Sequence, residues 1–136
     1  MQGRDFLDVA RDVLFQAKEP YWRATVIHAY DALMLECRDA PARWSISIVP
    51  RQNAHSAVRL RLLYASDFDL KEIGSKLDDW GRYRNDASYN LTFQRQFASD
   101  ALAQRSIKEV TAALVLLDAI EADPARRAAA IASFQP

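Results

Sequence analysis

Apolar residues recur at steps of three and four along almost the whole chain, and this spacing constrains the fold more than any other feature. The widest apolar stripe lies between Trp22 and Cys37, where successive positions step by four, four, three and four. The chain has three glycines and no Asn-Gly or Asp-Gly pair, the usual signals of a β-hairpin. The sequence therefore predicts an all-α fold, an up-and-down bundle of four to five helices with a short C-terminal helix.

Breaks in the periodicity set the expected helix boundaries. They predict helices over about residues 4–17, 20–39, 51–64, 70–88 and 101–122. Residues 41–50 are expected to form a loop, in which the alternation of Trp44, Ile46 and Ile48 is also compatible with a short extended segment. Residues 66–69 should form a turn with capping residues. From 124 onward we expect a short alanine-rich helix that is either frayed or packed on a partner.

The apolar positions also predict which side of each helix faces the core. The expected inward residues are Phe6, Val9, Val13 and Leu14, then Val26, Tyr30, Leu33 and Cys37 with Trp22, Ile27 and Met34, then Ala54, Val58 and Leu62, then Leu70, Ile73, Leu77 and Trp80, and finally Ile107, Val110, Leu114 and Leu117.

Composition is that of an ordinary globular protein. With 136 residues, half of them apolar, the chain is expected to form one domain with its core over about residues 4–122 and an accessory segment over 124–136. The zero net charge excludes a general attraction to nucleic acid or membrane but permits a local basic patch. A single cysteine fits a reducing compartment, and without a signal peptide or a long apolar run the sequence indicates a cytoplasmic protein.

Metal and cofactor sites are not expected. The sequence has no glycine-rich phosphate loop, no His-Glu-x-x-His and no Cys-x-x-Cys motif. His28 and His55 are the only histidines, and neither has a ligand partner at helical spacing. Neighbouring carboxylates such as Asp78 and Asp79 are typical of a solvated helix face or a helix cap.

The segment Arg82-Tyr-Arg-Asn-Asp-Ala-Ser-Tyr89 interrupts the apolar pattern. Arg84 lies four residues after Trp80, on a face that should be apolar. A guanidinium directed at a core must be paired or must line a cavity. Arg84 therefore marks a cleft, reaches solvent, or pairs with a carboxylate such as Asp31 or Glu36.

Polar residues of the second and third expected helices are candidates to join Arg84. Tyr30 lies on the central stripe, so its hydroxyl needs a buried partner, for which Arg84 and His55 are candidates. His28 and His55 each border an apolar face, and the simpler interpretation of each is a partly buried polar side chain.

These segments resemble the HEPN superfamily, and within it the small single-domain bacterial proteins. Residues 23–36, Arg-Ala-Thr-Val-Ile-His-Ala-Tyr-Asp-Ala-Leu-Met-Leu-Glu, resemble the Ala-Tyr-Tyr-Ala-x-Phe-His-Ala helix of that family. His55 falls where this branch often has a histidine that opens the third helix. Arg84-Asn-Asp-Ala-Ser-Tyr89 resembles the Arg-x-x-Ala-Asp-Tyr ending of the fourth helix. The resemblance covers about residues 4–122.

The resemblance implies a helical bundle that usually forms a homodimer, with a cleft lined by the arginine motif of both chains. Many relatives are metal-independent ribonucleases, often toxins of toxin–antitoxin pairs or parts of antiviral systems. Their motif is an arginine, a polar residue and, a few residues later, a histidine. Arg84 and Asn85 match this motif, whereas Tyr89 stands in place of the histidine and Ser88 in place of the family's aspartate.

The missing histidine changes the expected chemistry, because a tyrosine with a pKa of about 10 is a poor base at neutral pH. Tyr89 can still donate a hydrogen bond or stack on a base. Arg84 can clamp a phosphate or stabilise a phosphorane transition state. His55 would replace the missing base if the third helix brings it close to Arg84.

Three functional hypotheses follow from these residues. The first is an RNA-binding or RNA-cleaving protein of a toxin–antitoxin or defence system, in which Arg84 anchors a phosphate, Asn85 orients it and Tyr89 positions the substrate. The second is a non-catalytic, antitoxin-type interaction module for a partner such as a cognate nucleotidyltransferase, with Arg84 satisfied by carboxylates. The third is nucleotide binding between aromatic walls. For RNA binding, the supporting residues are Arg84 with Arg82 and Tyr83, and a basic rim formed by Arg51, Arg59, Arg61 and Arg82. For nucleotide binding, Tyr30, Trp80 and Tyr83 are the expected aromatic walls.

Overall fold

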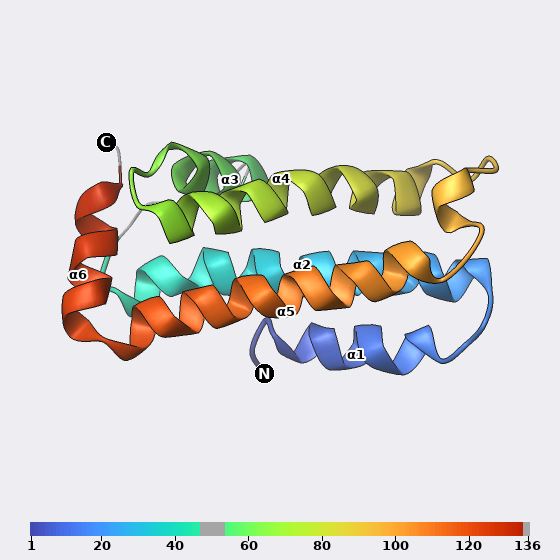
Figure 1. The fold of residues 1–136 in the computed structure, drawn as a ribbon, viewed down its shortest axis with the longest axis horizontal. Helices are drawn as coiled ribbons and strands as arrows, with labels where there is room; N and C mark the ends of the chain where they lie inside the picture. Colours follow the sequence, from blue (N-terminus) through green and yellow to red (C-terminus); the bar gives the residue numbers. More distant parts are fainter. Residues whose placement is uncertain (47–53, 135–136) are drawn as a thin grey trace.

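The structure is a computed structural model that describes residues 1–46 and 54–134. Over these residues it contains helices and no strand, in the order α1 (Asp5–Leu14), α2 (Glu19–Arg43), α3 (Ala54–Tyr64), α4 (Phe68–Tyr89), the 3-10 turn η1 (Arg95–Phe97), α5 (Ala101–Ala122) and α6 (Pro124–Ser133). Figure 1 shows α1, α2, α4 and α5 lying along the long axis, with the chain direction reversing from each to the next. The all-α bundle predicted from the apolar spacing is confirmed.

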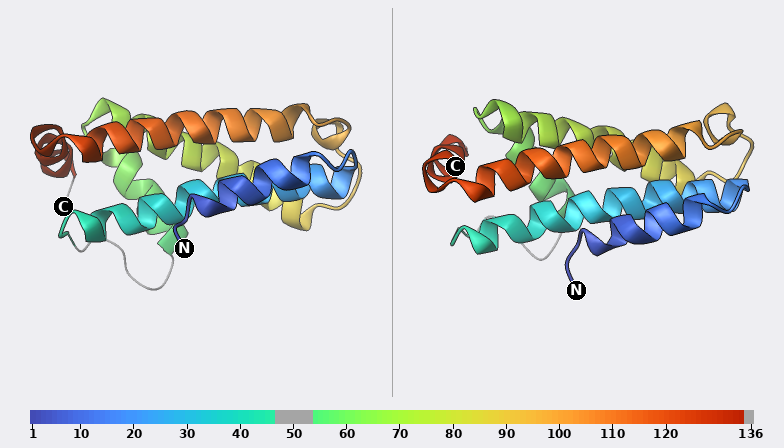
Figure 2. Two further views of the ribbon diagram at one scale, coloured as in Figure 1. Left: turned by 90° about the horizontal axis from the view of Figure 1, so that it is seen from below. Right: turned by 60° about the horizontal axis from the view of Figure 1, so that its bottom comes forward.

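Helix α2 is the central helix of the bundle. It packs against α1, α3, α4 and α5, and the right view of Figure 2 shows it running between α1 and α5. Its predicted stripe is confirmed, because Val26, Leu33 and Cys37 are buried and Tyr30 is only 6% exposed. Trp22 is half-buried and lies at the edge of the stripe. A helix this widely covered holds its polar side chains in fixed surroundings, which matters for the site described below.

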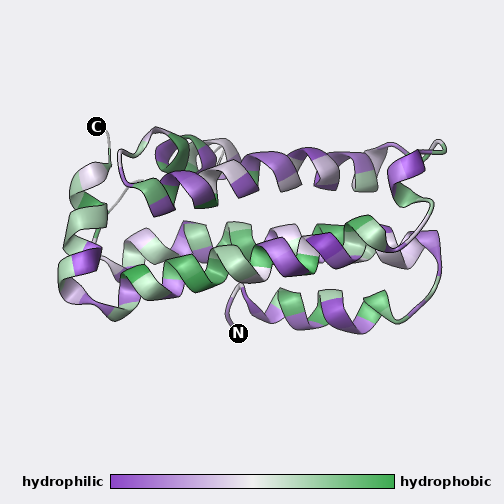
Figure 3. Cartoon of the chain, in the orientation of Figure 1, coloured by the Kyte–Doolittle hydropathy of each residue, from purple (hydrophilic) through white to green (hydrophobic). Residues whose placement is uncertain are grey.

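Helices α4 and α5 complete the core. The predicted inward residues of α4 are fully or almost fully buried, as are Val110, Leu114 and Leu117 of α5. Figure 3 shows that the visible side of α4 is mostly hydrophilic, whereas α5 carries long hydrophobic stretches. Helix α4 therefore turns a polar surface to solvent and an apolar one inward, and Arg84 interrupts that inner surface near its end.

The face that the sequence predicts for α1 is only partly correct, because Phe6 and Leu14 pack against the core but other residues are buried most deeply. Leu7 and Ala10 are its buried residues, while Val9, expected to point inward, is exposed. The reason is a close approach of the chain to α2 through small residues. The carbonyl of Ala10 accepts a hydrogen bond from the Thr25 hydroxyl, and a Cβ atom at Gly3 would lie only 2.6 Å from Cβ of Leu35. The helix also ends at Leu14 rather than near residue 17.

Helix α2 does not end before Pro41 as predicted. It continues through this proline to Arg43, and Trp44 then caps it by donating its backbone N–H to the carbonyl of Ala40. Burial of Trp44, which packs against Phe134 with ring centroids 6.4 Å apart, outweighs the local preference of the residue before a proline. Ser45 adopts a positive φ of 62° just beyond the helix, as at many helix ends. The expected alternation of residues 44, 46 and 48 extends outside the described residues.

Helix α6 packs on its own chain rather than fraying. Arg126 donates hydrogen bonds to Asp67 and Asp69 at the start of α4, and the backbone N–H of Ser66 bonds to the carbonyl of Ser133. Asp67 also caps α4 by accepting from the backbone N–H of Leu70, so the predicted capping residue is confirmed, although residues 68 and 69 of the predicted turn belong to the helix. Helix α4 begins at Phe68, two residues earlier than predicted.

A buried carboxylate joins three helices. Glu36 of α2, 3% exposed, lies 3.1 Å from Arg4 and 3.4 Å from Arg43, and these arginines pair in turn with Asp118 and Glu121 of α5. A buried carboxylate needs such partners to remain charged. The ion pairs of Glu36 therefore belong to the contact between α1, α2 and α5, and Glu36 is not the partner of Arg84.

Candidate functional site

Arg84 lies on the inner side of α4 and is half-buried. Its Nε atom is buried and has no hydrogen-bond partner among the described residues. Within the same part of the chain no carboxylate oxygen comes within 4 Å of its guanidinium, so the predicted ion pairs with Asp31 and Glu36 do not form. A charged group in this position retains hydrogen-bonding capacity for a ligand.

A hydrogen bond joins the second and third helices beside this arginine. The hydroxyl of Tyr30 lies 2.9 Å from Nδ1 of His55, and the two rings stack with centroids 5.8 Å apart. Burial raises the pKa of the Tyr30 phenol, and the opposing charge of Arg84 limits this effect. The phenol therefore keeps its proton at neutral pH and can donate to the imidazole or accept from it. Of the two candidates for its partner, His55 forms the hydrogen bond.

Asp31 is the fourth member of what we term the acid–base cluster, made of Tyr30, Asp31, His55 and Arg84. Burial raises the pKa of the Asp31 carboxyl, while the positive charge of Arg84 acts in the opposite direction. These charges therefore lie within electrostatic reach of one another, although Arg84 and Asp31 do not form a contact ion pair. The cluster brings together residues that are far apart in the sequence.

His28 lies against α1 and is not part of the acid–base cluster. Its ring stacks on Phe6 of α1, with centroids 5.8 Å apart and an interplanar angle of 2°. Its Nδ1 atom is buried and lacks a hydrogen-bond partner among the described residues. The simpler interpretation, a partly buried polar side chain, fits this position better than a catalytic one. His55, in contrast, is exposed and bonded to the acid–base cluster.

Three other predicted site residues of the Arg82–Tyr89 segment, Arg82, Asn85 and Tyr89, are exposed and form no hydrogen bond or ion pair with the cluster in the described residues. Asn85 is exposed, and Tyr89, which is the last residue of α4 and not the first after it, is 76% exposed with its ring 6.0 Å from the Arg84 guanidinium. Arg82 pairs with Asp78 and Asp79, at 3.0 and 2.8 Å. The charge of Arg82 is thus largely offset, which weakens the expected basic rim.

The expected aromatic walls do not surround one open pocket. Trp80 is fully buried, and its ring lies 5.0 Å from that of Tyr83, with Arg105 above both rings. A buried indole offers no face to a nucleotide base. Tyr30 packs on the other side of α4, beside Gly81.

An open groove runs along the surface between the first half of α2 and the end of α4, on the side of Arg84. Its volume is about 450 Å³, within the size range of small-molecule sites. We call this the α2–α4 groove. It lies one helical turn beyond Arg84, because Ser88 and Arg84 are four residues apart. Its lining residues are Glu19, Pro20, Arg23, Ala24, Ile27, Ala87, Ser88 and Leu91.

Arg23 holds the end of α4 in place, a role that sequence reasoning missed. Its Nη1 atom donates to the carbonyls of Asp86, Ala87 and Asn90, at 3.0, 3.3 and 2.7 Å. Its guanidinium lies 4.3 Å from the centre of the Phe97 ring. These carbonyls lie at the end of α4, where a helix leaves backbone acceptors free, although that of Asp86 also accepts from the backbone N–H of Asn90. A positive charge inside the apolar stripe of α2 was the available signal, since Arg23 follows Trp22 directly.

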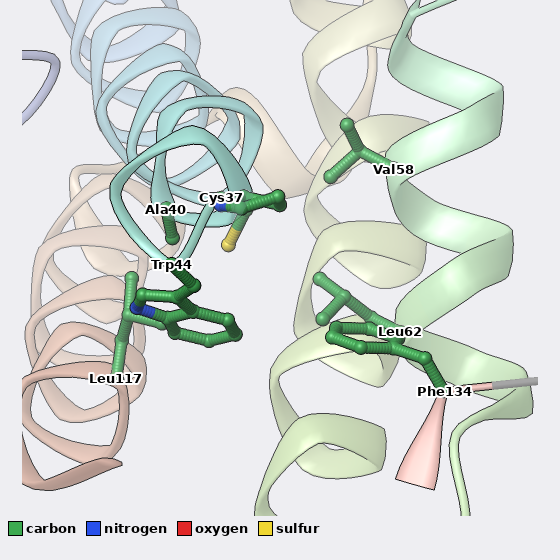
Figure 4. Close-up of a pocket in the computed structure, with 8 residues that line it drawn as sticks. Cys37, Ala40, Trp44, Val58, Leu62, Leu117 and Phe134 are labelled. Atoms are coloured by element: carbon green, nitrogen blue, oxygen red, sulfur yellow. The ribbon is translucent and has the colours of Figure 1, made fainter. Parts of the chain in front are cut away.

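A second, smaller cavity lies at the opposite end of the bundle. Figure 4 shows Cys37, Trp44, Leu62 and Phe134 around it, and its volume of about 10 Å³ accommodates at most one water molecule. Burial raises the pKa of the Cys37 thiol, so this group is neutral and unreactive. This cavity is a gap in the packing rather than a ligand site.

Residues 1–46 and 54–134 contain no group of histidine, cysteine and carboxylate side chains placed to bind a metal ion. No helix in those same ranges has the length and apolar character needed to cross a membrane. Comparison of the chain with models of known protein families, with curated proteins and with solved structures finds no match.

Proposed function

We propose that this chain is a HEPN-like RNA-binding protein in which Arg84 holds a phosphate of the RNA backbone. The observation that carries the proposal is a half-buried arginine without an ion-pair partner among the described residues, next to the Tyr30–His55 hydrogen bond. If this arginine had only a structural role, we would expect it to form a salt bridge with a nearby carboxylate. A guanidinium offers paired N–H donors that match the oxygens of a phosphate.

Metal-independent cleavage is the chemistry that such a cluster supports. The 2′-oxygen of a ribose attacks the adjacent phosphorus, the bond to the 5′-oxygen breaks, and the products are a 2′,3′-cyclic phosphate and a 5′-hydroxyl. His55 takes the proton of the 2′-hydroxyl, and Arg84 stabilises the charge on the phosphorane. The departing 5′-oxygen takes its proton from the His55 imidazolium through water, which returns the imidazole to its neutral form. Tyr30 orients the imidazole through its hydrogen bond. Tyr89, exposed beyond Arg84, is in position to stack on a base rather than to act as a base.

The test is incubation of the purified protein with single-stranded and structured RNA, beside the Arg84→Ala and His55→Ala variants. Arg84→Ala should lower RNA affinity by about tenfold, because one charged contact to phosphate is lost. His55→Ala should abolish cleavage and leave binding in place. Arg11→Ala, an exposed position on α1, is the matched control for the charge change. Equal affinities for wild type and Arg84→Ala would overturn the proposal.

The proposal includes a homodimer whose cleft carries Arg84 from both chains, as the resemblance implies. Sedimentation of the wild-type protein at increasing concentration measures this directly. A monomer at all concentrations that still binds RNA through Arg84 would remove the dimer from the proposal and keep the phosphate site.

A second candidate, a non-catalytic antitoxin-type module, is favoured by the apolar side chains just after α4. Leu91 and Phe93 are 76% and 79% exposed. Exposed large apolar groups in one place are typical of a protein interface. Binding to a cognate nucleotidyltransferase that is lost in Phe93→Ser and unaffected in Arg84→Ala would favour this candidate over RNA binding.

A further inference from the structure

The α2–α4 groove contains a charged pair that the proposed RNA site does not use. Glu19 and Arg23 lie one turn apart at the start of α2, with Nε of Arg23 3.4 Å from the Glu19 carboxylate. Both residues line the groove, opposite Ser88 and Leu91. The pair therefore lies within the groove that begins one turn beyond Arg84.

Arg23 has hydrogen-bonding capacity that its own chain does not use. The residue is 5% exposed, and its Nη1 atom is occupied by the carbonyls at the end of α4. Its Nη2 atom is buried and finds no acceptor among the described residues. A guanidinium N–H without an acceptor is unfavourable in a buried position, and a ligand that supplies a carbonyl oxygen relieves this. The Glu19 side chain is 39% exposed, so its carboxylate is open to an N–H donor of the same ligand.

The remaining walls suit a flat, apolar group. Pro20, Ala24, Ile27 and Leu91 contribute only carbon atoms beyond their backbone. Such walls disfavour a phosphate, which keeps its place at Arg84, and they offer an apolar surface to a planar ring. The groove thus places the Glu19 carboxylate, an acceptor, next to the unpartnered guanidinium of Arg23, a donor, on an open and largely apolar surface.

We propose that the α2–α4 groove is a subsite for one unpaired nucleobase, a guanine next to the phosphate that Arg84 holds. Guanine presents its O6 acceptor beside its N1–H and N2–H donors, which matches Arg23 followed by Glu19. Adenine presents an amino group in place of O6, so a donor faces a donor. The subsite rests on the proposed RNA-binding function and adds a base preference to it.

The experiment measures the affinity of the full chain for a short oligoadenylate that carries one central guanine, against the same RNA with adenine or inosine at that position. Wild type should bind the guanine RNA about tenfold more tightly than the all-adenine RNA, the usual effect of one paired base contact. Inosine, which keeps O6 and N1–H but lacks the amino group, should fall between the two.

Two variants connect that preference to the groove. Glu19→Gln should bring the guanine-to-adenine ratio close to one. Glu72→Gln is its matched control, because Glu72 forms a similar pair with Lys76, at 3.9 Å and four residues away, elsewhere on the bundle. Ala24→Phe fills the groove and should remove the preference while keeping the Arg84-dependent binding of oligoadenylate.

The outcomes separate the subsite from the function on which it rests. Equal affinity for guanine and adenine RNA, together with loss of binding in Arg84→Ala, would overturn the subsite alone. A preference that survives both Glu19→Gln and Ala24→Phe would also place guanine recognition outside this groove. No binding of any RNA by wild type would overturn the proposed function and the subsite together.

Discussion

The hydroxyl of Tyr30 and the Nδ1 atom of His55 lie 2.9 Å apart, although the two residues belong to different helices. Tyr30 is almost fully buried on α2, whereas His55 lies exposed near the start of α3. The pair therefore connects the bundle core to an imidazole at the surface. Because the other ring nitrogen of His55 is not used in this bond, it can exchange a proton with a substrate.

A double-mutant cycle measures what this bond contributes. We expect Tyr30→Phe and His55→Ala to show a coupling of about 1 kcal/mol in the free energy of unfolding, the usual net contribution of a neutral hydrogen bond. Urea denaturation of wild type, both single variants and the double variant gives this number. Tyr30→Phe should also slow RNA cleavage while RNA affinity is unchanged. Additive effects of the two substitutions on stability would contradict the coupling.

The contact between α6 and the start of α4 should make stability sensitive to acid. The hydrogen bonds from Arg126 are the main reason that the pKa of Asp67 is lowered in the folded protein. A lowered folded-state pKa stabilises the fold above the unfolded value of about 4, and this stabilisation is lost as the pH falls further. When the pH is lowered from 7 to 3, the free energy of unfolding should fall in both proteins. It should fall by roughly 1 kcal/mol less in Asp67→Asn than in wild type, because asparagine still caps the helix but carries no charge.

Asp123→Asn is the control for this prediction. Asp123 caps α6 through the backbone N–H of Ala125 and has no ion pair among the described residues. Its substitution should change the pH dependence less than Asp67→Asn does. Parallel pH profiles for Asp67→Asn and wild type would show that the ion pair with Arg126 contributes nothing measurable.

The spacing of apolar residues was sufficient to predict most of the core, because a buried helix stripe repeats every three to four residues. It was insufficient for α1, where the close approach of Ala10 and Gly3 to α2 decides which side faces inward. It also misplaced the end of α2, since the burial of Trp44 overrides the local effect of Pro41. Both errors arise where tertiary contacts compete with local preference.

The same contrast between local sequence pattern and tertiary contact applies to the residues of the candidate site. Arg84 was identifiable because a charge at an apolar position is a local irregularity. His55 was identifiable as a candidate partner for the Tyr30 hydroxyl, and the resemblance added a second reason to consider it. The role of Arg23 was not identifiable, because its three acceptors lie 63 to 67 residues further along the chain. The pairing of Arg82 with Asp78 and Asp79 could have been anticipated from their spacing of four and three residues on one helix.

Cys37 should be protected from thiol reagents in the folded protein. Its side chain is 4% exposed, and burial raises the pKa of the thiol, so the reactive thiolate is scarce. Labelling with a thiol reagent at neutral pH should be slow in buffer and complete in denaturing urea. An Ala112→Cys variant, at an exposed position of α5, provides the comparison. Equal labelling rates at the two positions in buffer would contradict the burial of Cys37.

Arg23 should contribute more to stability than any exposed arginine of the bundle. Arg23→Met removes the charged donor of three carbonyls at the end of α4 while keeping much of the side-chain volume. We expect a loss of about 3 kcal/mol in the free energy of unfolding, because hydrogen bonds to a charged group are strong and the acceptors are partly buried. The loss should be concentrated at one end of the molecule, so amide hydrogen exchange over residues 88–97 should accelerate before the rest of the bundle is affected.

Arg11→Met is the matched control, since Arg11 is exposed on α1 and pairs only with Asp8 in the salt bridges of the described residues. It should change stability by less than about 0.5 kcal/mol. Arg23→Lys separates charge from geometry. A single ammonium group cannot bond to three carbonyls and cover the Phe97 ring at once, so lysine should restore only part of the loss. Full recovery by lysine would mean that charge alone holds the end of α4.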